Sequence, residues 1–293
     1  VIQRMAAILS AQSPSFDATH FVAVASIDHE TNELKQRSQQ IQAALKATLP
    51  NQLDDLAPIL LGALGPEAPI DGGVTSNDRD GLNGFAIMPI CDFVAEIGIN
   101  DWPEAAALFE ELTKRFSAEF AVRPFLAKDP EATLKTFHNW AKSDNPHVRR
   151  LASEGCRPLL PWGIRLHAFV KDPTPLLPIL ETLKDDPTEY VRRSVANNIN
   201  DIAKNHPDLV ADLAARWMQD ASKNRQRLVR HACRTLIKKG HPPTLAALGY
   251  KPIELDQSKF EILTPTVEFG TGLKFKYLLT PHAPGSHPYI LDF

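Results

Sequence analysis

Between residues 85 and 250, apolar side chains recur with the 3.6-residue period of amphipathic helices. Expected helix starts are marked by a capping Asp or Asn directly before a proline, at Asp129-Pro130, Asn145-Pro146, Asp172-Pro173 and Asp186-Pro187. Gly240 closes the last strongly basic helix. Helices at this spacing predict antiparallel pairs stacked side by side, as in a solenoid.

The pattern changes toward the N-terminus. Residues 1–20 are small and polar and predict a ragged arm, and helices are expected at 33–49 and 53–64. The segment 65–86 is rich in Gly, Pro, Asp and Asn, which predicts a long surface loop of the kind that is usually functional or mobile. It lacks the Gly-Lys-Ser/Thr ending of a phosphate-binding loop.

After Tyr250 the period changes from 3.6 to 2. Phe260 alternates with Ile262, further apolar residues alternate from Leu273 to Leu279, and the chain stops inside an apparent strand at 289–293. The pattern therefore predicts a short β-rich segment over residues 251–293. It is either a truncated β-domain or a small sheet that packs on the helices.

One phrase occurs three times within the helical part: Val148-Arg149-Arg150, Val191-Arg192-Arg193 and Val229-Arg230-His231. The repeats start 43 and 38 residues apart, close to the period of about 40–47 residues of HEAT-type helical pairs. The predicted fold is mainly α, a HEAT-like solenoid over residues 21–250.

Charge is unevenly distributed along the chain. The net charge is −3, but residues 145–240 hold 17 Lys and Arg against 10 Asp and Glu, a net +7. A basic subregion is the footprint expected where phosphates bind, although a solvated helix face explains it equally well. The sequence shows no membrane span, signal peptide or metal-binding histidine motif, and its three cysteines predict reduced, buried thiols in a cytoplasm.

A helical wheel separates two faces in each repeat. The core stripe consists of Val148, Ala152, Gly155 and Cys156; Val191, Val195, Asn198 and Ile199; and Val229, Cys233, Leu236 and Ile237. The opposite face is cationic, with Glu154 and Asp201 embedded in it. These carboxylates either neutralise their neighbours or stabilise a positive charge that develops during a reaction. Trp162, in the turn Pro161-Trp162-Gly163, is either a core anchor or a platform for a ligand.

The phrases around these residues resemble one family. They are VRRLASEGCRPLLPWG from Val148, DPTEYVRRSVANNINDIAK from Asp186 and LVRHACRTLIKKGHP from Leu228. They are similar to the AlkC branch of the HEAT-repeat alkylation-repair DNA glycosylases, the relatives of AlkD. The likeness extends more weakly from about residue 20 to Tyr250. Some members have an immunoglobulin-like domain at the carboxyl end, which implies that residues 251–293 are part of one.

The resemblance implies a monofunctional glycosylase that removes small cationic bases such as 3-methyladenine and 3-methylcytosine from double-stranded DNA. It implies a monomer that needs no cofactor or metal and does not fully flip the base. The implied catalytic residues are Glu119, Glu154, Asp201 and Trp162. The implied DNA contacts are Arg150, Arg157, Arg192, Arg193, Arg230, His231 and Lys238. Leu159 stands where close relatives are expected to have a basic residue, which removes one phosphate contact.

A second hypothesis is a HEAT-type scaffold that binds nucleic acid or an acidic protein without chemistry. Both hypotheses predict the basic face. They differ at the carboxylates, because a pure phosphate binder gains affinity when Glu154 and Asp201 are neutralised, whereas a glycosylase loses excision.

Overall fold

The computed structural model describes residues 1–70, 81–251 and 255–282. The helices of its first half are α1 (Ile2–Gln12), α2 (Ala18–Ala25), α3 (Leu34–Thr48), α4 (Leu53–Ala63), α5 (Ile87–Ile97), α6 (Trp102–Thr113), α7 (Arg123–Lys128) and α8 (Pro130–Trp140). Those of the second half are α9 (Pro146–Glu154), α10 (His167–Lys171), α11 (Leu177–Leu183), α12 (Glu189–Ala203), α13 (Pro207–Met218), α14 (Lys223–Ala232), α15 (Arg234–Lys238) and α16 (Pro242–Ala247). Two short 3-10 helices, Gly84–Ala86 and Thr174–Leu176, precede α5 and α11.

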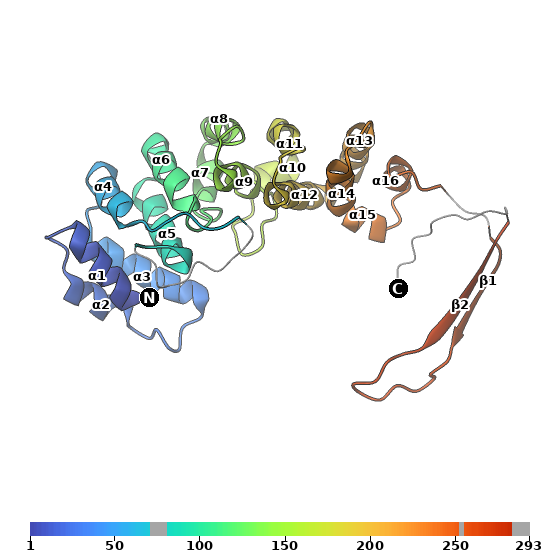
Figure 1. Ribbon diagram of the computed structural model, residues 1–293, viewed down its shortest axis with the longest axis horizontal. Helices are drawn as coiled ribbons and strands as arrows, with labels where there is room; N and C mark the ends of the chain where they lie inside the picture. Colours follow the sequence, from blue (N-terminus) through green and yellow to red (C-terminus); the bar gives the residue numbers. More distant parts are fainter. Residues whose placement is uncertain (71–80, 252–254, 283–293) are drawn as a thin grey trace.

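The helices form a curved double row (Figure 1). Helices α4, α6, α8, α11 and α13 follow the outer edge, and α5, α9, α12 and α14 follow the inner edge. Along the inner row, α12 packs against both α9 and α14. This arrangement confirms the predicted helical-repeat solenoid and places the repeated Val-Arg phrase on its inner helices.

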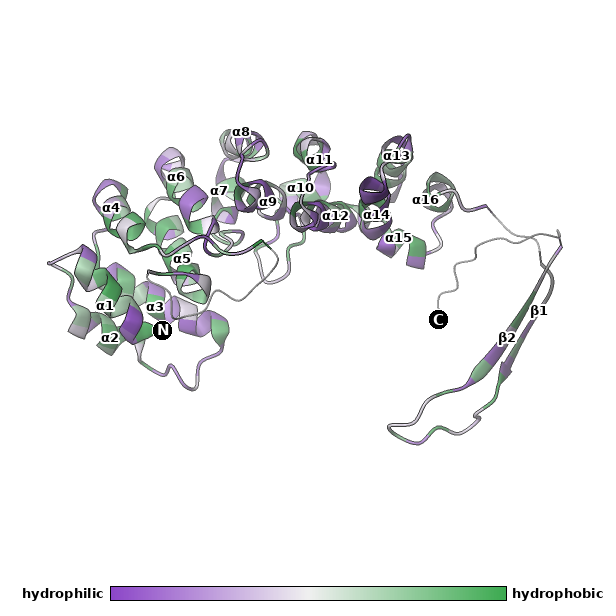
Figure 2. Cartoon of the chain, in the orientation of Figure 1, coloured by the Kyte–Doolittle hydropathy of each residue, from purple (hydrophilic) through white to green (hydrophobic). Residues whose placement is uncertain are grey.

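The core stripe of the wheel is confirmed. The three repeated valines are at most 2% exposed, and Figure 2 shows hydrophobic and hydrophilic residues interspersed along the helices. Cys91, Cys156 and Cys233 are buried free thiols. Burial raises the pKa of Cys156 and of Cys233 to about 12, so both thiols stay protonated and act as small apolar side chains.

The predicted helix starts are correct at two positions and early at two others. Asp129 and Asn145 cap α8 and α9, accepting bonds from backbone N–H groups at 3.0 and 2.9 Å. Asp172 and Asp186 also accept a bond from an N–H group, at 3.0 and 2.8 Å, but the α-helices that follow them begin only at Leu177 and Glu189.

The prediction of a ragged arm over residues 1–20 is wrong. Residues 2–12 form α1, which packs against α2 and α4. Ile2, Met5 and Leu9 lie at helical spacing, and Met5 and Leu9 are completely buried. This apolar stripe is narrow and is separated by alanines, and for that reason the composition of the segment concealed it.

The C-terminal part forms an antiparallel hairpin of β1 (Leu255–Ile262) and β2 (Phe275–Pro281), in which Phe260 pairs with Tyr277. The predicted alternation is therefore confirmed. Phe260 and Tyr277 are 60% and 47% exposed, and Figure 1 shows the hairpin apart from the helices. The alternative of a sheet packed on the helices is wrong. The expected strand at 289–293 lies outside the described residues, and the immunoglobulin-like assignment stays a prediction.

Candidate active site and DNA interface

Three of the predicted acidic residues and two arginines form one continuous series of ion pairs, which we call the ion-pair ladder. Arg150 lies 3.0 Å from the Glu119 carboxylate and 3.7 Å from that of Glu154. Arg157 then joins Glu154, at 2.6 Å, to Asp201, at 2.9 Å. Positive and negative groups thus alternate from end to end.

Three neighbouring segments supply the ladder. Glu119 comes from the connection between α6 and α7, Arg150 and Glu154 stand one turn apart on α9, and Asp201 lies on α12. Arg157 follows the end of α9 and reaches across to α12. The ladder depends on the packing of α9 against α12, because the side-by-side helices bring residues 44 positions apart into contact.

Glu154 is placed on the predicted side of its helix but is only 4% exposed, because the neighbouring inner helix covers it. Burial alone raises the pKa of this carboxyl group. The charges of Arg150 and Arg157 and a 2.6 Å hydrogen bond from Ser194 outweigh that effect and lower its pKa below the usual range. Glu154 is therefore ionised, and its buried charge is fully compensated.

Glu119 differs from the other two carboxylates in its hydrogen bonds. Its Oε2 accepts bonds from Ser117, at 2.8 Å, and from Arg150, whereas no donor in the described residues reaches its Oε1. Both oxygens of Asp201 are occupied, by Arg157 and by Lys204 at 3.0 Å. One carboxylate oxygen at the Glu119 end is thus free to bind a further group.

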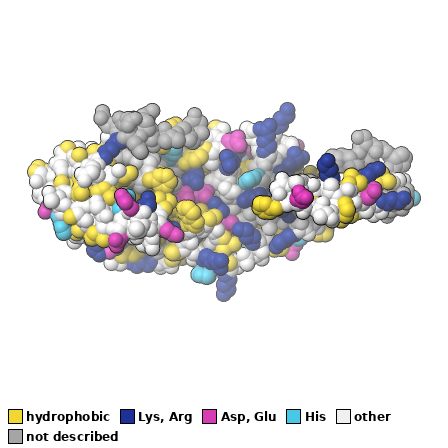
Figure 3. All heavy atoms as spheres, turned by 90° about the horizontal axis from the view of Figure 1, so that it is seen from below, with side chains coloured by type: hydrophobic (Ala, Val, Ile, Leu, Met, Phe, Trp, Pro, Cys, Tyr) yellow, Lys and Arg dark blue, Asp and Glu magenta, His cyan; other side chains and the backbone are white. Residues whose placement is uncertain are grey.

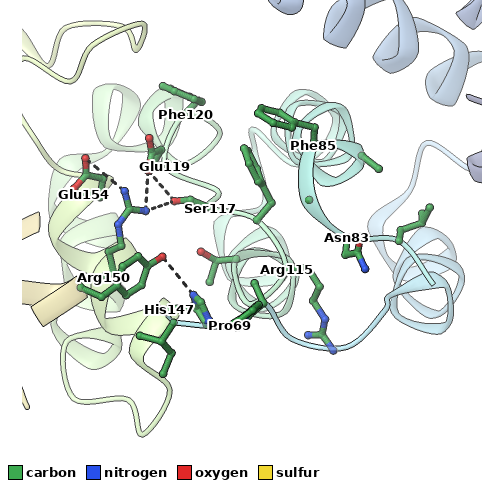
Figure 4. Close-up of a pocket in the computed structure, with 18 of the residues that line it drawn as sticks. Pro69, Asn83, Phe85, Arg115, Ser117, Glu119, Phe120, His147, Arg150 and Glu154 are labelled. Atoms are coloured by element: carbon green, nitrogen blue, oxygen red, sulfur yellow. Dashed lines mark hydrogen bonds and ion pairs between the residues drawn. The ribbon is translucent and has the colours of Figure 1, made fainter. Parts of the chain in front are cut away.

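A cavity of about 1110 Å³ opens beside this end of the ladder (Figure 4). Its polar wall contains Glu119, Arg150 and Glu154, and its aromatic wall contains Phe85, Phe116 and Phe120. The flanks of the predicted 65–86 loop also line it. The loop therefore lies against the site, although residues 71–80 are outside the described part.

Trp162 lies on the loop that joins α9 to α10 and is 70% exposed, so it is not a core anchor. Its φ of 65° is in the left-handed region, which costs a non-glycine residue about 1–3 kcal/mol. Lys35 donates a hydrogen bond to the Trp162 carbonyl and lies 5.6 Å from the centre of the Phe120 ring. The Trp162 loop is thereby held next to the aromatic wall of the cavity.

Comparisons with known proteins show which family the chain belongs to. A family model described as DNA alkylation repair enzyme matches residues 107–239. The chain is 37% identical to YhaZ, an uncharacterized protein of Bacillus subtilis, over 268 residues that make up 91% of this chain and 71% of that protein. It also resembles the structure of Pseudomonas fluorescens alkylpurine DNA glycosylase AlkC bound to DNA containing an abasic site analog. The TM-score is 0.74 and the identity 32%, over 97% of this chain and 74% of that one. The chain belongs to the AlkC-type DNA alkylation repair proteins.

The cations that the AlkC resemblance marks as DNA contacts fall into two groups. Arg150 and Arg157 are enclosed by carboxylates, and only 9% of the Arg157 side chain is exposed, which leaves no free fork for a phosphate. Arg192 donates to the backbone carbonyl of Asp186. The remaining four are exposed and form no ion pair within the described residues: Arg193, Arg230, His231 and Lys238. Burial and the charges of Arg234 and Arg193 lower the pKa of His231 below its ordinary value, so its ring is largely neutral at pH 7. We call the other three, Arg193, Arg230 and Lys238, the outer cations. Basic side chains gather beside the hollow of the inner face in Figure 3.

Tyr190 and His147, which sequence reasoning missed, support the ladder. The Tyr190 ring lies under the Arg150 guanidinium, 5.1 Å from its carbon, and its hydroxyl is 3.3 Å from Nδ1 of His147. Nε2 of His147 donates to the carbonyl of Ala68 at 2.8 Å, so Nδ1 accepts from Tyr190. Tyr190 directly precedes the core valine of its repeat, a position that the wheel does not distinguish from a solvated one.

Within residues 1–70, 81–251 and 255–282, no group of three or more His, Cys, Asp or Glu side chains could hold a metal ion. In the same ranges, none of the helices combines the length and the apolarity needed to cross a membrane.

Proposed function

We propose that this protein is a monofunctional DNA glycosylase that hydrolyses the N-glycosidic bond of small cationic alkylated bases, such as 3-methyladenine and 3-methylcytosine. The observation that supports this most directly is the ion-pair ladder. Arg150, Arg157 and Lys204 pair with its three carboxylates, yet its Glu119 end opens into a cavity with one carboxylate oxygen free.

Hydrolysis of the N-glycosidic bond of a cationic base depends more on negative charge near the sugar than on a general acid that protonates the base. An alkylated base that is already cationic leaves readily, and the cost of the reaction lies in the oxocarbenium-like sugar that remains. A preorganised carboxylate in a partly dehydrated site stabilises that charge without reorganisation. The Glu119 carboxylate, whose Oε1 is free at the end of the ladder that opens into the cavity, is suited to this task.

The carboxylates have different roles in this proposal. Glu119 orients the attacking water through its free Oε1 and faces the developing charge. Glu154 and Asp201, whose oxygens are all occupied, fix the arginines and maintain the local field. Trp162 presents its exposed indole to the deoxyribose, where an aromatic face attracts positive charge by about 0.5–2 kcal/mol.

The outer cations hold the phosphates of double-stranded DNA, with the protein acting as a monomer. Arginine suits this role because its planar fork binds phosphate oxygens in pairs. The base is not rotated fully out of the duplex during the reaction. The exposed Arg193, Arg230 and Lys238 support this, since cations suit phosphates of the strand rather than a single base.

The proposal is tested by incubating the purified protein with methylated DNA and separating the released bases by chromatography. We expect release of 3-methyladenine and 3-methylcytosine. Asp201→Asn should bind the DNA with unchanged or higher affinity and release these bases at least tenfold more slowly. If wild-type protein binds the DNA and releases no base, the chain is a non-catalytic scaffold.

A further inference from the structure

Arg123, the first residue of α7, lies wholly inside the protein with a relative exposure of 0%. Among the described residues it forms no ion pair with a carboxylate; its donors bind backbone carbonyls instead. Nη1 donates to Gly155 at 2.9 Å, and Nε donates to Ile164 at 2.8 Å, where Nη2 binds the same oxygen. The one guanidinium thus fastens both ends of the segment 155–164.

The segment between these two anchor points is the loop that carries Trp162. Gly163 lies directly on the Arg123 side chain, because a Cβ built there would stand 2.9 Å from the Arg123 Nε. Its φ is not in the left-handed region, so close packing alone requires glycine at this position. Trp162, one residue earlier, has the strained backbone and the exposed ring.

Burying an uncompensated cation is unfavourable, and here burial lowers the pKa of Arg123 to about 10. An apolar side chain of similar volume would fill the space without that cost. An apolar residue cannot, however, bind two carbonyls on opposite ends of a loop. The buried guanidinium does so, and it therefore fixes the position of the loop.

We propose that Arg123 is the positioning residue for Trp162. It holds the loop 155–164 in the conformation that exposes the indole, and Lys35, which lies over the Phe120 ring, fixes the same loop by binding the Trp162 carbonyl. This inference rests on the proposed function in one respect: Trp162 is the group through which Arg123 affects base excision.

The first test is Arg123→Lys, which keeps the charge and loses the planar fork. We expect single-turnover release of 3-methyladenine to fall about 10- to 100-fold, because small displacements of a group at the reacting centre have effects of this size. In a Trp162→Ala background the same substitution should cause no further loss. Arg37→Lys is the matched control, since Arg37 also binds two loop carbonyls, those of Asn32 and Glu30, away from the cavity. Arg37→Lys should release 3-methyladenine at the wild-type rate.

Gly163→Ala provides a second variant, should Arg123→Lys not fold. The added methyl group displaces the loop while Arg123 stays in place, and a similar loss of excision is expected. Quenching of tryptophan fluorescence by iodide reports on the same loop without any reaction, because Trp162 is 70% exposed, whereas Trp140 and Trp217 are 3% exposed and Trp102 is only partly exposed. Both variants should change the quenching constant.

The inference is overturned if Arg123→Lys slows excision equally with and without Trp162, or if it only lowers the melting temperature. Unchanged iodide quenching in both variants also overturns it. If wild-type protein releases no base at all, the proposed function fails instead. The quenching experiment then still decides whether Arg123 positions Trp162.

Discussion

Helices α9 and α14 both contain the repeated phrase and use its basic residues in opposite ways. In α9, Arg150 is held between Glu119 and Glu154 inside the ladder. In α14, Arg230 and His231 are exposed and form no ion pair in the described part of the chain. The repeat therefore places a cation at a fixed position, and the nearby carboxylates determine whether that cation becomes structural or remains available to a partner.

Position along the inner row explains the difference. Helix α9 lies in the middle of the row against α12, where a charge loses water and must be paired. The outer face of α14 remains hydrated, so its charges need no partner and contribute little to folding. Substitutions in the two helices should accordingly affect different properties of the protein.

The largest expected effect is on stability at the ladder. Glu154→Ala leaves Arg150 and Arg157 without their shared partner, and we expect the free energy of unfolding to fall by about 3–5 kcal/mol. Urea denaturation measures it. The control is Lys135→Ala, which breaks the exposed pair with Glu131 and should cost less than about 1 kcal/mol. Equal losses in the two variants would contradict the distinction between buried and exposed pairs.

A smaller effect is expected from pH, through His147. Burial and the nearby Arg150 charge lower the pKa of His147 below its ordinary value of 6.5, and its bond to Ala68 offsets this only in part. The unfolded chain therefore binds the proton more readily. The stability that neutral His147 contributes is complete above pH 6.5 and is lost as the pH falls through the lowered pKa.

Urea denaturation at pH 7.5 and pH 5 tests this. Wild type should lose more stability between the two values than His147→Gln. The lowered pKa values of Glu154 and Asp186 act only below their ordinary values of 4.5 and 3.8, outside this window. If wild type and His147→Gln lose the same stability between pH 7.5 and pH 5, His147 is not responsible for the pH dependence.

The smallest effect is on DNA affinity. Replacing Arg193 or Arg230 by Gln should reduce the slope of log affinity against log salt by about 0.9, the value for one lost phosphate contact. Arg157→Gln should leave the slope unchanged, since Arg157 is occupied by carboxylates. Fluorescence anisotropy over a salt series measures all three. A reduced slope for Arg157→Gln would place that residue at the DNA after all.

The repeated phrase and the cap-proline pairs were sufficient to predict the solenoid and its core stripe. They also indicated that Glu154 and Asp201 lie among cations. The ladder itself was not predictable, because it depends on which side chains of adjacent helices meet after packing. Arg157 illustrates this: its position on the wheel is cationic surface, yet its actual partners come from two different helices. Tyr190 and Arg123 were missed because their roles consist of contacts with residues 32 or more positions away.

The most direct test of the central claim is a comparison of Glu119→Gln with wild type on DNA that contains 3-methyladenine. Affinity and single-turnover excision are measured on the same samples, with the exposed Glu131→Gln as control. The account predicts unchanged affinity and a loss of excision of about 100-fold or more, as for removal of one preorganised electrostatic group. Excision at the wild-type rate with folded Glu119→Gln would show that the free carboxylate at the end of the ladder does not take part in the chemistry.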